Sequence, residues 1–148
     1  MKIYFATDHA GFELKNTLLP YVKDELGYEV EDCGAHTLDA DDDYPDFIRK
    51  AANAVAGNPE NAKAIILGGS GQGEAIVSNR VSGVRAGTYY GGNLDIVRLS
   101  REHNDSNVLS LGAHFLSPED AKEAVKLWLE TDFSGDERHV RRINKIDT

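Results

Sequence analysis

The stretch AKAIILGGSGQGEAIVSNR, residues 62–80, indicates the fold class of this chain of 148 residues. Its apolar start favours a buried strand, its glycines favour a tight turn, and Glu74 falls in the first turn of the helix expected next. Turn N–H groups and the positive end of a helix stabilise anions. The stretch therefore predicts an anion cradle beside a carboxylate base. The alternative is a tight turn without a ligand, and the Lys-Ser/Thr ending of a nucleotide-binding P-loop is missing.

Composition indicates a globular protein. A chain of 148 residues, 41% hydrophobic and 28% charged, is expected to form a single domain over residues 1–148. No apolar run approaches the ~20 residues that span a bilayer, and the N-terminal residues become polar too soon for a secretory signal. We therefore expect a cytoplasmic protein without a membrane partner. The lone Cys33 has no disulfide or zinc partner and is expected to be a small buried apolar residue.

Charge is distributed unevenly along the chain. The net charge of −9 argues against a nucleic-acid partner, because backbone phosphates are bound by concentrated Lys and Arg. In the C-terminal tail, about residues 132–148, Arg138, Arg142 and Lys145 have helical spacing and could form a basic face. The alternative is a solvated charged helix. The acidic run Asp39–Asp43 lacks the spacing of a calcium loop and is expected to be solvated.

Apolar strands alternate with helical segments. The expected strands are 2–7, 28–34, 62–68, 84–90 and 107–113. In the first helix Pro20 could introduce a kink. Helical periodicity is clearest in the last long segment, through Ala121, Ala124, Val125, Trp128 and Leu129. This alternation predicts an α/β fold, a three-layer α/β/α sandwich whose five-stranded parallel sheet has the flavodoxin-like (Rossmann-like) order 2-1-3-4-5.

Ligands of such sheets bind at the carboxyl edge, between the first and third strands. Asp8 and His9 follow the first strand, so we expect them beside Glu74; alternatively Asp8 caps a helix and His9 is a surface histidine. His103 precedes the last strand and the tail follows the last helix, which places both at the opposite edge. If they belong to the site, a second subunit must supply them. Otherwise His103 merely ends a helix.

Five motifs follow one another along nearly the whole chain: TDHAGFELK, DYPD, GGSGQGEAIVSNR, LSREHNDSNVLSLGAH and RHVRRI. With them the chain resembles the sugar-phosphate isomerases that comprise type B ribose-5-phosphate isomerase and the galactose-6-phosphate isomerase subunits. The resemblance implies interconversion of ribose 5-phosphate and ribulose 5-phosphate through a cis-enediol, without metal or cofactor, in a homodimer or homotetramer with shared sites. The alternatives are a tetrose or hexose phosphate as substrate, or a non-catalytic flavodoxin-like binding module.

The resemblance also implies roles for individual residues. Glu74 would be the base, His103 would donate a proton as the sugar ring opens, and Asp8 would assist that opening. The substrate-binding residues would be His9, Tyr44, Gly69, Ser70, Gly71, Gly73, Asn104, His114, Arg138 and Arg142. The two arginines would bind the phosphate, and the backbone between Gly69 and Gly73 would hold the enediolate oxygens.

Two positions depart from the family pattern. Many members have a cysteine base where this chain has Gly68, so Glu74 places the chain in the branch with a glutamate base. A free Glu, with a pKa of about 4.3, is ionised at neutral pH, whereas a thiol with a pKa of about 8.5 needs activation. His114 stands where members commonly have a phosphate-binding arginine, and a neutral imidazole binds phosphate less well than a guanidinium.

Overall fold

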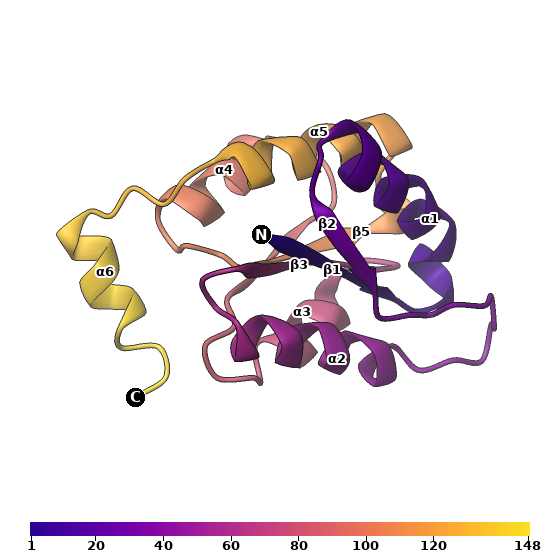
Figure 1. The fold of residues 1–148 in the computed structure, drawn as a ribbon, viewed down its shortest axis with the longest axis horizontal. Coiled ribbons are helices and arrows are strands. Elements are labelled where there is room, and N and C mark those ends of the chain that lie inside the picture. Colours follow the sequence, from indigo (N-terminus) through magenta and orange to yellow (C-terminus); the bar gives the residue numbers. More distant parts are fainter.

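The computed structural model describes residues 1–148, which form a five-stranded parallel sheet between two layers of helices (Figure 1). The strands are β1 (Lys2–Thr7), β2 (Glu29–Asp32), β3 (Ala62–Gly68), β4 (Ala86–Tyr89) and β5 (Val108–Gly112). The predicted α/β class is confirmed. The predicted strands coincide with β1 and β3 and differ from the other three only at their ends.

The order of the last two strands was predicted wrongly. The sheet has the order β2-β1-β3-β5-β4, so β5 pairs with β3 and β4 lies at the edge. All of β5 is buried, whereas Ala86, Gly87 and Thr88 of β4 are partly exposed. A parallel sheet buries more apolar surface when its most apolar strands are central, which accounts for the exchange.

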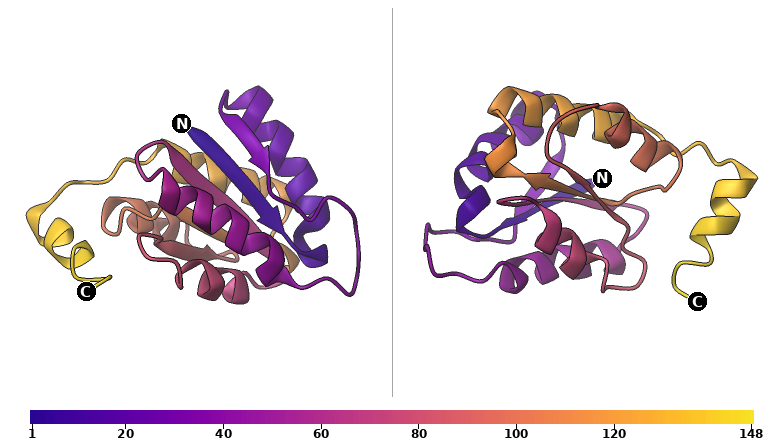
Figure 2. Two further views of the ribbon diagram at one scale, coloured as in Figure 1. Left: turned by 60° about the horizontal axis from the view of Figure 1, so that its bottom comes forward. Right: turned by 180° about the vertical axis from the view of Figure 1, so that it is seen from behind.

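Helices cover both faces of the sheet. One face is covered by α1 (Phe12–Pro20), α4 (Asp95–Glu102) and α5 (Pro118–Glu130), and the other by α2 (Tyr44–Gly57) and α3 (Gln72–Ser78) (Figure 1). Short 3-10 turns, η1 (His9–Gly11) and η3 (Ala113–Phe115), follow β1 and β5. The last helix, α6 (Glu137–Ile143), stands apart from the sandwich, at the end of the molecule opposite η1 (Figures 1 and 2). None of the helices has the length and hydrophobicity that a membrane span requires.

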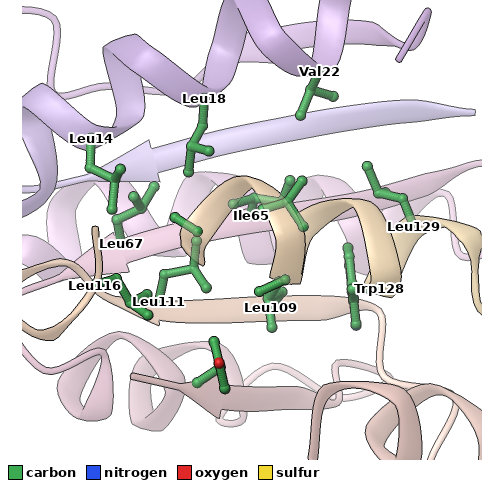
Figure 3. Packing of buried hydrophobic residues seen from close by; sticks show 14 of the residues in the cluster. Leu14, Leu18, Val22, Ile65, Leu67, Leu109, Leu111, Leu116, Trp128 and Leu129 are labelled. Carbon is green, nitrogen blue, oxygen red and sulfur yellow. The ribbon is translucent and has the colours of Figure 1, made fainter. Parts of the chain in front are cut away.

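Side-chain alternation along the strands builds a core on each face. In β3, Ile65 and Leu67 face α1 and α5, while Ala64 and Ile66 face α2. Figure 3 shows the first core, in which Leu18 and Trp128 are fully buried. Burial of one large apolar side chain stabilises by about 1.5–3 kcal/mol, so both cores hold the strand ends firmly in place. The loops that leave these ends start from fixed positions.

The helix type changes after Pro20. The chain continues from α1 into a π-helical turn, η2 (Tyr21–Glu25), where the N–H of Leu26 donates to the carbonyl of Tyr21 at 3.1 Å. Proline has no N–H to continue the regular ladder, and a wider turn accommodates the loss. Val22 stays fully buried, so the apolar face is maintained.

A buried ion pair ties α1 to the end of β2. Lys15 is fully buried, and its Nζ donates to both carboxylate oxygens of Asp32, at 2.7 and 2.8 Å, and to the carbonyl of Ala35 at 2.6 Å. A buried ammonium needs such complete pairing. The pair fixes the start of the loop between β2 and α2. In that loop Cys33 is half-buried, and burial raises the pKa of its thiol to about 11, which agrees with an apolar packing role.

Candidate active site

Three loops meet at the carboxyl edge of the sheet. Thr7, the last residue of β1, lies beside Leu67 of β3, and Gly68 of β3 lies beside Gly112 of β5. The loops that start there contain Asp8 and His9, the glycine turn, and His114. The expected meeting of the first and third loops is therefore what the structure shows.

The glycine turn is held from below by β5. Gly71 has a φ of 79°, in the left-handed region that favours glycine, and the Ser110 hydroxyl donates to its carbonyl at 2.6 Å. The exposed Ser70 accepts from the N–H of Gln72 at 3.4 Å. Gly71, the N-cap residue of α3, has no side chain to cap the helix, so the positive end of this short helix faces the edge.

Glu74 is buried against Gly68. Glu74 is only 4% exposed, and a Cβ at position 68 would overlap the Glu74 carboxylate. Burial raises the pKa of Glu74 above its usual value, and the negative charge of Asp8 raises it further, while a hydrogen bond from its own backbone N–H opposes them. A buried carboxylate with a raised pKa is a stronger proton acceptor than an exposed one. A cysteine at position 68 and this arrangement of Glu74 exclude each other.

Asp8 and His9 form a polar cluster with Asp42. Asp8 accepts from the N–H of Ala10 at 2.9 Å, so it caps η1 as well as facing Glu74. His9 is not a free surface histidine, because its Nδ1 lies 2.7 Å from Oδ1 of Asp42. Asp8, His9 and Asp42 have potential metal-ligand atoms within 4.8 Å of one another. A cation could bind all three only by breaking the hydrogen bond between His9 and Asp42.

Tyr44 and His114 flank the glycine turn. Tyr44 begins α2 and its ring covers Gly73, where a Cβ would collide with it. The N–H of His114 donates to the carbonyl of Gly69 at 3.1 Å, and its ring packs on the same glycine. Both side chains therefore lie at the glycine turn.

The remaining predicted residues lie at the opposite edge. His103 follows the end of α4, and its ring stacks on His139 of α6 with centroids 4.3 Å apart and planes 16° apart. A pocket of about 360 Å³ opens beside this stack. It is lined by His103, Asn104, His139, Arg142, Ile143 and Ile146. Arg138 is exposed outside this lining. In one subunit these groups and Glu74 are thus separated.

Known proteins agree with this architecture. The Ribose/Galactose Isomerase family model matches residues 3–146. The chain belongs to this isomerase family. Ribose-5-phosphate isomerase B of Mycolicibacterium paratuberculosis is 38% identical over 144 residues, which cover 97% of this chain and 88% of that protein.

Solved structures of relatives share the fold. Ribose-5-phosphate isomerase B of Clostridium thermocellum superposes with a TM-score of 0.91 at 39% identity, covering 99% of this chain and 95% of that one. The Mycoplasma genitalium enzyme with bound ribulose-5-phosphate has a TM-score of 0.92 at 34% identity, covering 98% and 93%. The predicted family is confirmed, and the chain is a sugar-phosphate isomerase of the aldose–ketose type.

Sequence reasoning overlooked three residues of this isomerase. Asp42 lies within the acidic run that was expected to be solvated, yet its side chain is 8% exposed and bonded to His9. His139, in the RHVRRI motif, is buried against His103, and burial lowers its pKa, helped by the charges of His103 and Arg138. Gly68 looked like a missing cysteine, whereas it makes room for Glu74. For Gly68 the only signal in the sequence was the extra glycine directly before the glycine turn.

Proposed function

We propose that this isomerase interconverts ribose 5-phosphate and ribulose 5-phosphate through a cis-enediol, with Glu74 as the base. The observation that supports this most directly is the buried Glu74 carboxylate, which occupies the space beside the glycine turn where a side chain at position 68 would lie. The relatives named above are ribose-5-phosphate isomerases, and one of them holds ribulose-5-phosphate. These findings favour a pentose phosphate over a tetrose or hexose phosphate.

The proposed chemistry needs one base and an anion cradle. Glu74 removes the proton from C2 of the open-chain aldose and returns it to C1, while the proton of the 2-hydroxyl moves to the oxygen at C1. Negative charge develops on these oxygens between the two steps. N–H groups between Gly69 and Gly73 stabilise it, and one well-placed donor contributes about 3–4 kcal/mol in other enzymes. Asp8 and His9 contact the sugar during ring opening.

Replacing Glu74 with glutamine tests the base. The amide keeps the shape of the side chain but cannot accept the proton, so kcat should fall by about 10²–10⁴ while substrate binding and the fold persist. Glu119→Gln, in the exposed first turn of α5, is the matched control and should retain wild-type turnover. Wild-type turnover in Glu74→Gln would move the base elsewhere, with Asp8 the next candidate.

A panel of sugar phosphates tests which substrate the enzyme prefers. Ribose 5-phosphate, a tetrose 4-phosphate and a hexose 6-phosphate, assayed side by side, should give the highest kcat/KM for ribose 5-phosphate. A higher value for another chain length would reassign the substrate. Inactivity on every member would favour a binding module that has lost catalysis.

We further propose that residues 1–148 act as one domain and that two subunits share each site. His103 and Asn104 lie at the edge opposite Glu74, and α6, with Arg138 and Arg142, projects from that same end. In a dimer the tail would dock on the neighbour, where His103 donates a proton in ring opening and the arginines bind the phosphate. Mixing Glu74→Gln with His103→Ala should restore part of the activity. No recovery after proven subunit exchange would contradict sharing.

A further inference from the structure

Asp42 makes two hydrogen bonds to a single residue. Its Oδ1 accepts from the backbone N–H of His9 at 3.0 Å and from the ring at Nδ1, 2.7 Å away. The two residues are 33 positions apart, so the loop between β2 and α2 folds back to bring them together. The side chain of Asp42 is 8% exposed, whereas that of His9 is 38% exposed.

This contact determines which ring nitrogen faces the site. A carboxylate can only accept a hydrogen bond, so Nδ1 of His9 must bear a proton. Nε2 is then the nitrogen available to a ligand. The second oxygen of Asp42 is buried without any hydrogen-bond partner. A buried carboxylate with so few partners is costly unless a positive charge lies beside it, and a protonated His9 would be that charge.

The other charged groups around His9 act in the same direction. Asp42 contributes most to raising the pKa of His9, and Asp8 and Asp39 add to it, while partial burial of the ring opposes them. Asp8 lies on the same turn, with Oδ2 3.9 Å from Nδ1. The neighbouring turn η3 contains His114, and Glu74 lies beyond Asp8 as a further acidic group. The surroundings of His9 are thus dominated by carboxylates.

We propose that Asp42 is a positioning residue of this isomerase, which holds His9 as an imidazolium with Nε2–H directed at an oxygen of the bound sugar phosphate. The identity of that ligand rests on the proposed function, whereas the state of His9 does not. An imidazolium donates a charge-assisted hydrogen bond, which is about twice as strong as a neutral one. Asp42 would therefore act on substrate binding through His9, without touching substrate itself.

The test compares Asp42→Asn with Asp41→Asn. Asparagine can still accept from Nδ1–H but removes the charge, and Asp41 is an exposed neighbour whose replacement makes the same change in net charge. In wild type and in Asp41→Asn, the ring of His9, followed by NMR, should titrate above the ordinary pKa of about 6.5. In Asp42→Asn the pKa should fall to about that value or below it.

Kinetics supply a second readout. At a pH between the two His9 pKa values that NMR gives for Asp42→Asn and for wild type, Asp42→Asn should raise KM for ribose 5-phosphate by about 10-fold, as expected for losing one charged hydrogen bond, with kcat changed by less than about twofold. At a pH well below both of these pKa values, where His9 is protonated in both proteins, the ratio of the KM values should return to near unity. A merely structural loop contact would give a ratio that does not depend on pH.

Either readout can overturn the inference. An ordinary His9 pKa in wild type would do so without any variant, even if Asp42→Asn failed to fold. An unchanged His9 titration in Asp42→Asn, an equal effect of Asp41→Asn, or a pH-independent ratio of KM values would also contradict it. The NMR titration needs no turnover, so a protein inactive on every sugar phosphate would refute the proposed function and still leave the role of Asp42 decided.

Discussion

The carboxylate of Glu74 lies in the space that a side chain at position 68 would need. Gly68 is therefore part of how the proposed base is held, because only a residue without a Cβ lets Glu74 remain buried against the end of β3. A cysteine at position 68, as the resemblance implies for many family members, and the proposed base Glu74 would compete for one volume. A chain can use a cysteine at position 68 or the buried glutamate at position 74, but not both together.

Gly68→Ala should displace the base. Its Cβ would push the Glu74 carboxylate away from the turn, and we expect kcat to fall by at least about 10², a loss similar to that of removing a general base. Gly57→Ala, at a position where a Cβ meets nothing, is the matched control and should stay fully active. Circular dichroism and a thermal melt would confirm that both variants fold. Full activity in Gly68→Ala would mean that Glu74 works from another position.

Gly68→Cys combined with Glu74→Ala should place a thiol in the vacated volume. We expect turnover above that of Glu74→Ala alone, with an alkaline shift of the pH–rate profile towards the ordinary thiol pKa of about 8.5. Iodoacetamide should abolish the regained activity. The half-buried Cys33 is present in both proteins, so the single variant controls for its modification. Equal turnover in the two variants would show that the volume alone does not suffice.

Glu74 should make the protein less stable as the pH rises. Its pKa is raised by folding, so the native state binds a proton more readily than the unfolded chain, and stability is lost as the pH rises through the folded pKa. Glu74→Gln removes this effect. Urea unfolding should show that Glu74→Gln is more stable than wild type at pH 8 and equally stable near pH 4. A gain of equal size at both pH values would point to packing rather than charge.

The contact of the tail with the body should weaken in acid. Burial lowers the pKa of His139, so folding favours its neutral form, and the stability that this form contributes is lost as the pH falls below the ordinary value of about 6.5. Hydrogen exchange in residues 133–146, corrected for intrinsic rates, should be faster at pH 5.5 than at pH 7.5. His139→Phe keeps a ring against His103 without a titrating group and should remove the difference. If the difference in exchange between the two pH values persists in His139→Phe, another titrating group causes it.

His114→Arg should change substrate preference. The ring of His114 packs on Gly69, so a longer and permanently charged side chain there would reach over the glycine turn. We expect KM for ribose 5-phosphate to fall by about 10-fold and kcat/KM for a hexose phosphate to fall relative to it. An equal fall in KM for every phosphorylated sugar would indicate uniform phosphate binding. Unaltered kinetics on all substrates would remove His114 from the site.

Periodicity and topology were sufficient to predict much of this molecule. The central strand β3 is apolar on both faces, follows the polar residues Glu60 and Asn61 and ends in glycine, so its limits follow from sequence. The meeting of Asp8 with Glu74 followed from the crossover rule for parallel sheets. The order of β4 and β5 did not follow, because the alternation of strands and helices along the chain does not specify which of the two strands pairs with β3.

The site residues that the sequence did not predict depend on how loops and side chains are placed in three dimensions. Asp42 looks like its acidic neighbours, and only the path of the loop places its carboxylate on His9. The role of Gly68 depends on the rotamer of Glu74, which no sequence pattern specifies. His139 lies between arginines in the motif, and its burial follows from the stacking of its ring on that of His103.

The enclosure of Lys15 turns this residue into an internal reporter. Its ammonium is fully buried by Asp32 and Ala35, while the other lysines all keep some exposure. An amine-acylating reagent should therefore modify the surface lysines of folded molecules at once and reach Lys15 only in molecules that have opened. The acylated fraction of the peptide around Lys15, read by mass spectrometry, would count unfolding events even in an unpurified mixture.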